Sequence, residues 1–351
     1  MTRQARQAGD HIHGVTYTRR AVLYNAVRSG LGVAVTSAIG VWTHAPSVAG
    51  AASSVTIGYS KAGLTCEGAV FAAQAQGYFH DEGLALTTMA LAGPAAIAAE
   101  MMKGNVAAMQ DPAWTLVPPL LPKGMPVGDM VATAGLQRGS MSLVVPATSA
   151  IRSVADLRAL KVSAGARWRF MFGQPLRAAG LNPQQDVDWQ PPLPPTQVAA
   201  AFSNQQVAVA AVHQPFAAAL ESSGVGRILM AQNAPPLQDD YCCAVIVPGA
   251  LIQSDRQKAA AITRALMRGS AWVRAHPSES AQLMLEVKHM TASLADTQRA
   301  MAALDFLPTV EVARRNTLDI VHRFKRLGFL DQTTDEQALL ERIFVPVTGE
   351  L

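Results

Sequence analysis

The segment SAGARWRF, residues 163–170, brings two arginines and a tryptophan together: Arg167, Trp168 and Arg169. Guanidinium groups bind carboxylates and sulfonates through charge-assisted hydrogen bonds, and an indole ring stacks on organic groups or cations. The surrounding pattern places these side chains where a strand leads into a helix N-terminus, which favours an anion. We predict that Arg167 or Arg169 binds an oxyanion and that Trp168 packs on the ligand. The alternative is that both arginines are solvated and that Trp168 is a packing residue.

Polar side chains also follow other short apolar runs that are typical of strands. They lie in the segments LTCEG, QDPAWTL and VAVAAVHQPF. Ligands of open parallel sheets bind beyond the carboxyl ends of the strands. The side chains that we predict to contact a ligand in these segments are Thr65, Gln110, Trp114, His213 and Gln214.

Three acidic or basic residues in these segments have structural interpretations as well. Asp111, next to Gln110, has the type and place of a helix N-cap. Glu67 complements the dipole of the helix that begins near it. His213 is either a ligand or hinge contact or a structural histidine.

The three cysteines are Cys66, Cys242 and Cys243. Neighbouring strand residues face opposite ways, so only one of the adjacent pair can point toward Cys66. The three are free buried residues, or Cys66 is bridged to one of the pair, or the thiols with His213 bind a soft metal. Cys66 and Cys242 are counted among the predicted ligand contacts, and the prediction includes no metal or cofactor.

Sequence signatures of catalysis are missing. The chain contains no G-x-S-x-G, no G-x-x-x-x-G-K-[ST] and no H-E-x-x-H. A Cys66–His213 nucleophile pair is the remaining enzymatic alternative. The sequence therefore favours a binding protein over an enzyme.

The positive charge of the chain is concentrated at its N-terminus. The 351 residues hold 29 Lys and Arg against 25 Asp and Glu, and residues 1–51 account for five arginines and one aspartate. The remaining residues are balanced, with 24 of each sign. A neutral body has no general attraction for nucleic acid, so we predict no nucleic-acid partner.

Residues 1–51 have the pattern of an export signal. Arg19-Arg20 in TYTRRAVL resembles a twin-arginine motif, and an apolar stretch follows at 29–42 that is short for a membrane span. Ala49-Gly50-Ala51 fits the A-x-A pattern of a cleavage site. We predict cleavage near Ala51 and a soluble periplasmic protein.

From residue 54 onward, short β-branched or apolar runs alternate with helical patterns. This order predicts an α/β fold with mainly parallel sheets and helices on both faces. The strand-like runs lie at 54–60, 85–91, 106–110, 141–146, 161–165, 186–190, 207–212, 227–230 and 241–247, and only helices are expected after 247. Residues 168–180 read as a helix that Pro175 should kink or break.

Two such series without a flexible linker predict two lobes with a cleft between them. MSLVVP crosses to the second lobe and YCCAVIV returns from it. We predict a first lobe from residues 52–145 and 245–351 and a second lobe from residues 146–244.

Residues 54–345 resemble the periplasmic solute-binding proteins of the nitrate, sulfonate and taurine transporters. The resemblance rests on VTIGYS…AVFAAQAQGYFHDEGLAL, MMKGNVAAM, SVADLRALKVS and WVRAHPSESAQLM, in this order. It implies a two-lobe periplasmic binding protein fold of type II, a small ligand, an inner-membrane ABC permease as partner and a monomer. A sister branch that makes the thiamine pyrimidine uses a run of several cysteines, and this chain has only Cys242-Cys243. A pyrimidine-precursor binding protein or pyrimidine-synthase-like enzyme is therefore the alternative.

Overall fold

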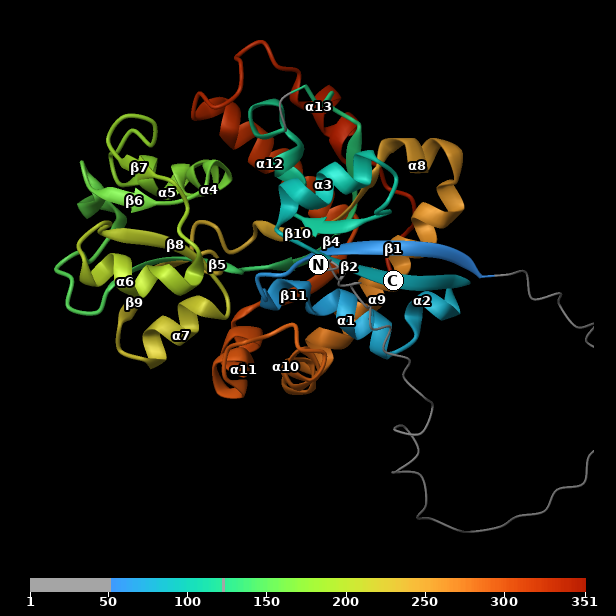
Figure 1. The fold of residues 1–351 in the computed structure, drawn as a ribbon. Coiled ribbons are helices and arrows are strands. Elements are labelled where there is room, and N and C mark those ends of the chain that lie inside the picture. Colours follow the sequence, from blue (N-terminus) through green and yellow to red (C-terminus); the bar gives the residue numbers. More distant parts are fainter. Residues whose placement is uncertain (1–51, 122–123) are drawn as a thin grey trace, which may run out of the picture. The chain divides into compact units, whose positions relative to one another are not determined.

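The computed structural model describes residues 52–121 and 124–351, which belong to one compact unit (Figure 1). The predicted export signal, with Arg19-Arg20 and the cleavage point near Ala51, lies outside the described residues. Within the described ranges, no helix combines the length and the apolar character that a membrane span requires.

The described strands form two larger sheets and one parallel pair. The four-stranded sheet has the order β11-β4-β10-β3, the five-stranded sheet has the order β7-β6-β8-β5-β9, and β1 pairs with β2. The bounds are β1 (Ser53–Ser60), β2 (Leu84–Leu91), β3 (Met109–Asp111), β4 (Met130–Arg138), β5 (Met141–Pro146), β6 (Lys161–Ser163), β7 (Asp188–Gln190), β8 (Val209–His213), β9 (Gly226–Ala231), β10 (Tyr241–Pro248) and β11 (Asp305–Thr309).

We call the part of the molecule around the four-stranded sheet, together with β1 and β2, the first lobe. The part around the five-stranded sheet is the second lobe. Figure 1 shows the second lobe mainly in green and yellow and the first lobe mainly in blue, teal, orange and red. The β1 strand continues the first-lobe sheet, because Ile57 forms a parallel bridge with Ala108 just before β3.

Helices connect the strands in both lobes. Their bounds are α1 (Gly68–Ala75), α2 (Tyr78–Asp81), α3 (Pro94–Met102), α4 (Ala166–Met171), α5 (Gly173–Ala178), α6 (Val198–Ser203), α7 (Phe216–Ser222), α8 (Gly249–Ser254), α9 (Arg256–Ala275), α10 (Pro277–Glu286), α11 (Leu294–Ala303), α12 (Glu311–Arg326) and α13 (Glu336–Ile343). Local sequence explains several of these ends: Pro94 and Pro277 open α3 and α10, and Asp255 caps α9 by accepting from Lys258 N.

The predicted α/β class is confirmed. Both sheets are mixed: most of their strands run in one direction, and β10, β11 and β5 run against the others. β10 is antiparallel to β3 and β4, and β5 is antiparallel to β8 and β9. β5 and β10 each enter a lobe directly from the other lobe, without a crossover helix. Each of these two strands therefore begins at the junction between the lobes. The neighbouring strands end at the junction, so β5 and β10 are antiparallel to them.

Two local predictions need correction. The chain is not purely helical after β10, because residues 305–309 form β11 at the edge of the first-lobe sheet. This run is short and contains Pro308, which removes the usual sequence pattern of a strand. The helix predicted at 168–180 begins at Ala166 and is divided at Phe172 into α4 and α5, before Pro175.

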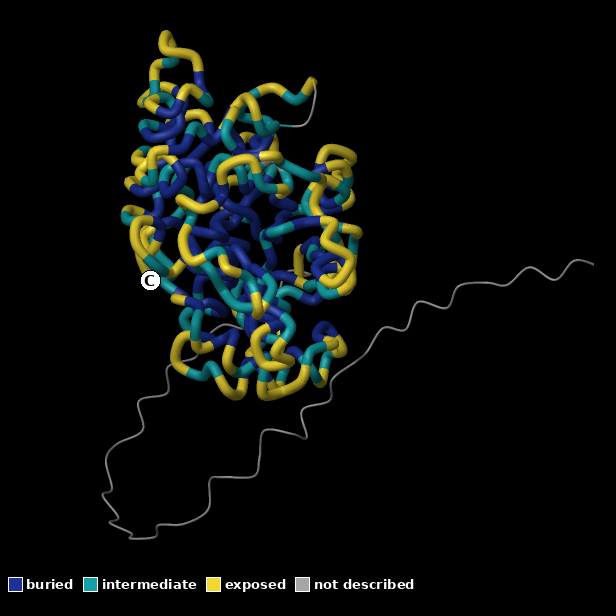
Figure 2. Tube along the Cα trace, turned by 90° about the vertical axis from the view of Figure 1, so that its left-hand side faces the viewer, coloured by how far each residue is buried: buried dark blue, intermediate teal, exposed yellow. Residues whose placement is uncertain are grey.

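Buried side chains fill the space between the layers of both lobes. Figure 2 shows the buried trace in the interior and exposed residues on the loops and outer helices. The main core includes Trp114, Phe172 and Tyr241, and a smaller core in the second lobe includes Val144 and Phe202. The main core therefore extends from the first lobe into α4 and α5 of the second.

Candidate functional site

Arg167 and Asp111 face each other from different lobes. Asp111 is the last residue of β3, and Arg167 lies in the first turn of α4. Arg167 Nη1 donates to Asp111 Oδ1 at 2.9 Å, and Nη2 donates to Oδ2. Thr115 Oγ1 also donates to Oδ2, at 3.0 Å. This two-pronged arrangement of a guanidinium and a carboxylate is strongly directional and joins the lobes.

Asp111 is largely removed from solvent. It is 5% exposed, whereas the side chain of Arg167 is 23% exposed. Burial raises the pKa of Asp111, and the charge of Arg167 and the Thr115 hydroxyl oppose that rise. The N-cap interpretation of Asp111 is wrong, because Pro112 holds that place and has no side-chain cap. The only feature of the sequence that could have indicated this ion pair is an acidic residue at the end of a strand in one lobe together with an arginine in the other lobe.

Aromatic rings lie beside this ion pair. The ring centroids of Trp168 and Trp114 are 6.1 Å apart, and those of Trp168 and His213 are 4.9 Å apart, with both pairs nearly perpendicular. Trp114 Nε1 donates to the Tyr241 carbonyl oxygen at 3.3 Å. Three residues predicted from separate segments therefore come together.

His213 is a neutral group in this site. Burial, followed by the charge of Arg167, lowers its pKa to about 3. At neutral pH the imidazole adds no positive charge beside Arg167. It offers one N–H donor and one nitrogen acceptor instead.

Thr65 and Gln214 meet at the junction of the lobes. Thr65 N donates to the Gln214 carbonyl at 3.2 Å, and Gln214 N donates to the Ser140 carbonyl at 2.8 Å. The Gln214 side chain accepts from Ala218 N at 3.1 Å. Thr65 Oγ1 is buried and has no hydrogen-bond partner among the described residues. Thr65 is 0% exposed, so this hydroxyl is closed off from solvent in this structure.

Gln110 lies against a buried acid. Its Nε2 donates to the Glu67 carbonyl at 3.4 Å, and its Oε1 has no partner within the described residues. Glu67 accepts from Ser60 N at 2.6 Å and lies 3.1 Å from His289 Nε2. Burial raises the pKa of Glu67, and the neighbouring His289 ring opposes that rise. Glu67 is thus an internal anchor of the loop that carries Thr65, and no sequence pattern pointed to His289.

Arg169 faces away from the ion pair. Its guanidinium carbon lies 5.7 Å from the ring centroid of Trp189 on β7, in its own lobe. Residues two apart on a helix do not share a face. The structure therefore brings Arg167, and not Arg169, to the first lobe.

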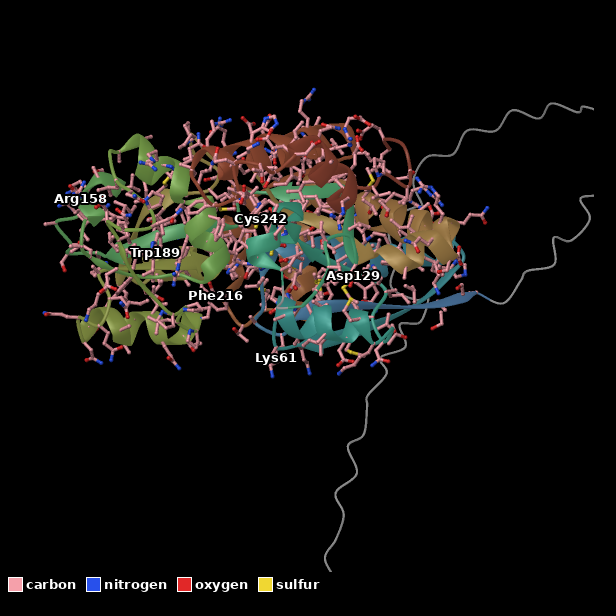
Figure 3. All side chains as sticks on the ribbon, turned by 90° about the horizontal axis from the view of Figure 1, so that it is seen from above. Lys61, Asp129, Arg158, Trp189, Phe216 and Cys242 are labelled. Atoms are coloured by element: carbon pink, nitrogen blue, oxygen red, sulfur yellow. The ribbon has the colours of Figure 1, made fainter. Side chains whose placement is uncertain are left out.

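The three cysteines are free and buried. Cys242 Sγ lies within hydrogen-bond distance of Ser140 Oγ, and Figure 3 places Cys242 near the junction of the lobes. The hydrogen bond with Cys243, followed by burial, raises the pKa of Cys242 well above its usual value. No cluster of three or more metal-ligating side chains occurs among the described residues. In this structure Cys66 and Cys242 therefore contribute protonated thiols to the junction.

A cavity of about 360 Å³ adjoins the ion pair. Asp111 and Thr115 from the first lobe and Gly165 and Arg167 from the second form its polar end. Most of the remaining wall is apolar and includes Ala95, Ala98, Met109, Leu116, Leu120 and Leu121. The cavity can hold a small molecule with one polar end.

Residues 49–287 match the model of the NMT1-like family. This chain belongs to the NMT1-like family. The match includes every predicted site residue and ends two residues before His289. A comparison with curated proteins found no match.

Solved structures similar to this NMT1-like chain share its fold. One is the alkanesulfonate-binding protein SsuA from Xanthomonas axonopodis pv. citri bound to MOPS, with a TM-score of 0.65, 17% identity and coverage of 82% of this chain and 97% of that one. Another is the periplasmic nitrate-binding protein NrtA from Synechocystis PCC 6803. Its TM-score is 0.69 and its sequence identity 14%, and the match covers 83% of this chain and 86% of that one. The desulfurization enzyme DSZB also matches, with a TM-score of 0.55, 14% identity and coverage of 82% of this chain and 96% of that one. The predicted periplasmic binding protein fold is confirmed.

Proposed function

We propose that this NMT1-like chain is the solute-binding component of an ABC importer and that an acid group of its solute binds Arg167. The position of the Arg167 guanidinium carries the proposal. It reaches from α4 to the end of β3, beside a cavity walled by residues of both lobes. Ligands of open α/β sheets bind at such strand ends. The similar sulfonate-binding and nitrate-binding proteins support a solute with an oxyanion.

The guanidinium, and not the helix end, supplies the charge for this acid group. α4 has only 6 residues, so its dipole adds little. Arg169 is a weaker candidate because it packs on Trp189. The other predicted residues do not line this cavity, and we propose them for a wider ligand site between the lobes. They are Thr65, Cys66, Gln110, Trp114, Trp168, His213, Gln214 and Cys242.

The transport role implies a working cycle. We propose that residues 52–145 with 245–351, and residues 146–244, move as the two lobes and close on the solute by a hinge motion. The protein would act as a periplasmic monomer and deliver its solute to an inner-membrane permease. The junction contacts between Thr65, Gln214 and Ser140 are compatible with a hinge at the two crossovers.

The chemistry of the site favours a carrier over an enzyme. A nucleophilic cysteine needs a thiolate. The hydrogen bond with Cys243 lowers the pKa of Cys66, but burial and the neighbouring Cys242 outweigh it and raise this pKa above its usual value. His213 contacts Trp168 and lies beside Arg167. Recovery of unchanged solute after denaturation supports the carrier, and turnover of the bound molecule would support the enzyme instead.

A thermal-shift screen of the mature protein across inorganic anions, sulfonates, carboxylates, amines and pyrimidines tests the proposal. A ligand at 100 times its Kd stabilises the protein by about 2.7 kcal/mol. Calorimetry on Arg167→Ala should then show binding weakened about tenfold to a hundredfold, because a charge-assisted hydrogen bond contributes about 1.5–3 kcal/mol. Arg169→Ala is the matched control and should stay within about twofold of the parent. Parent-like binding by Arg167→Ala would refute the assignment of the acid group.

A further inference from the structure

The ionic groups in the wall of the cavity cancel. Among the residues that line it, Asp111 and Arg167 are the charged ones, and each forms two hydrogen bonds with the other. Neighbouring ionic groups do not change this balance: His213 is neutral, Glu67 faces His289, and Arg169 lies against Trp189. A solute in this cavity therefore meets one positive and one negative group at the same end.

Asp111 opposes the binding of a plain anion. An anion that binds the two Nη groups of Arg167 through the donors that Asp111 occupies must displace the carboxylate of Asp111, which is 5% exposed. Only the Thr115 hydroxyl would remain as a partner in this structure. A buried charge that loses its partner is strongly unfavourable, and this penalty is subtracted from the affinity for the anion.

A solute that carries both charges avoids this penalty. A positively charged N–H group can replace the guanidinium at Asp111 while an acid group replaces the carboxylate at Arg167. The apolar side chains of Ala98, Leu116 and Leu120 suit the carbon skeleton between or beside the two groups.

We infer that Asp111 determines solute specificity: the accepted solute is a net-neutral zwitterion whose cationic N–H group binds Asp111 while its acid group binds Arg167. This inference rests on the proposed function and deepens it. Asp111 acts by direct contact with the solute, and simple inorganic anions and plain alkyl acids are poor ligands.

Two isosteric pairs of probes test the inference by calorimetry at constant pH and salt. The first pair is 3-aminopropane-1-sulfonate and butane-1-sulfonate, and the second is 6-aminohexanoate and heptanoate. Each pair differs by an ammonium group in place of a methyl group. The parent should bind the ammonium member at least tenfold more tightly than its partner in the pair with the better fit.

Asp111→Asn should remove this preference and bind the plain acid at least tenfold more tightly than the parent does. The ratio of the two affinities within one variant is the decisive readout, because a general loss of structure weakens both members equally. Asp111→Ser is a second neutral variant in case the asparagine form does not fold. Asp239→Asn, at an exposed carboxylate that does not line the cavity, is the control and should keep the parental ratio.

Equal binding of both members by the parent, or an unchanged ratio in the neutral variants, overturns the inference. The inference is also overturned if neither pair of probes binds while another solute of the wider screen binds through Arg167. In that case the proposed function survives. If no solute of the wider screen binds at all, the proposed function fails with it.

Discussion

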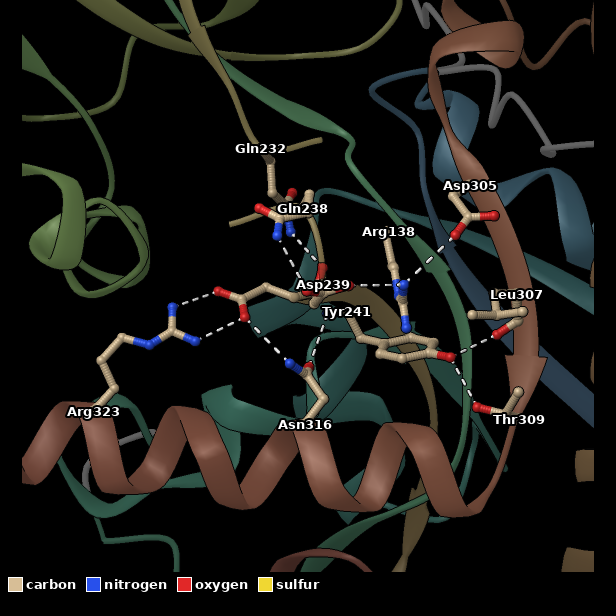
Figure 4. Close-up of polar contacts among 11 residues, drawn as sticks. Arg138, Gln232, Gln238, Asp239, Tyr241, Asp305, Leu307, Thr309, Asn316 and Arg323 are labelled. Carbon is tan, nitrogen blue, oxygen red and sulfur yellow. Dashed lines mark hydrogen bonds and ion pairs between the residues drawn. The ribbon is translucent and has the colours of Figure 1, made fainter. Parts of the chain in front are cut away.

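Asp240 and Arg323 form a buried, two-pronged ion pair where the chain returns from the second lobe to the first (Figure 4). Arg323 Nη1 donates to Asp240 Oδ2 at 2.6 Å, and Nη2 donates to Oδ1 at 2.8 Å. Asn316 adds a hydrogen bond to Oδ1 at 3.2 Å and accepts from Tyr241 N at 3.1 Å. The crossover before β10 is thereby tied to α12 of the first lobe.

Asp240→Asn should lower the free energy of unfolding by about 3–5 kcal/mol, because it leaves the Arg323 charge buried without its partner. The neighbouring variant Asp239→Asn is the matched control. The Asp239 side chain is 70% exposed and lies 3.3 Å from Arg138, so its loss should cost at most about 1 kcal/mol. Urea denaturation measures both, and equal losses in the two variants would contradict the importance of the buried pair.

Gly269→Ala in α9 should destabilise the protein by about 1–3 kcal/mol, although alanine favours helices over glycine by up to about 1 kcal/mol. A Cβ at this position would lie 2.2 Å from the Ala69 carbonyl oxygen and 2.9 Å from Ala73 Cβ. Helices α1 and α9 would have to separate. Thermal unfolding checks the sign, with Ala271→Gly in the same helix as the control for helix propensity. A stabilised Gly269→Ala variant would show that the helices are not so closely packed.

Acid should destabilise the folded protein through His213. Its pKa is about 3 in the folded state and returns to near 6.5 on unfolding, so the unfolded chain binds one more proton between these values. Stability from this residue is complete above about pH 6.5 and is lost as the pH falls, by about 1.4 kcal/mol per pH unit. Between pH 7 and pH 5 the loss is about 2 kcal/mol.

The comparison for His213 is His213→Gln, which lacks the titrating group. Urea unfolding of the parent and the variant at pH 7 and pH 5 gives the difference in pH dependence. A variant with the same pH dependence as the parent would mean that the pKa of His213 is not lowered in the folded protein.

Export should depend on Arg19 and Arg20. Replacing both with lysine should keep the protein out of the periplasm, because the twin-arginine pattern is lost while the charge stays the same. Arg3→Lys with Arg6→Lys is the charge-matched control. Mass spectrometry of the periplasmic protein should find a new N-terminus near Ala51; an intact N-terminus, or normal export of the Arg19/Arg20 variant, would contradict this prediction.

The α/β class and most strands of this fold could be predicted from local sequence. The run SVTIGYS became β1, and GPAAIAAEMMKGN became α3, because β-branched residues, Pro94 and Gly104 act on the backbone within a few residues. Two strands, β4 and β11, were not predicted. The place of β11 at the sheet edge depends on β4, which is far away in the chain.

The residues of the candidate site were likewise predicted only in part. Sequence indicated Arg167, Trp168, Trp114 and His213 by their positions at strand ends, but it could not choose between Arg167 and Arg169. It also treated Asp111 as a helix N-cap, and it placed Glu67 correctly at the start of a helix but without its partner His289. The helical geometry of α4 decided between Arg167 and Arg169. The roles of Asp111 and Glu67 were decided by their long-range partners, Arg167 and His289.

The sequence by itself therefore determined most of the segments that form strands and helices, although it missed β4 and β11. It also determined which polar residues lie at the ends of these segments, since both depend on interactions between neighbours along the chain. Only the tertiary structure decided the strand directions, the pairing of Asp111 with Arg167 and the neutrality of His213. The physical reason is that side-chain pairing and burial depend on distances between segments, and residues 56 positions apart in the sequence come into contact only when both lobes are assembled.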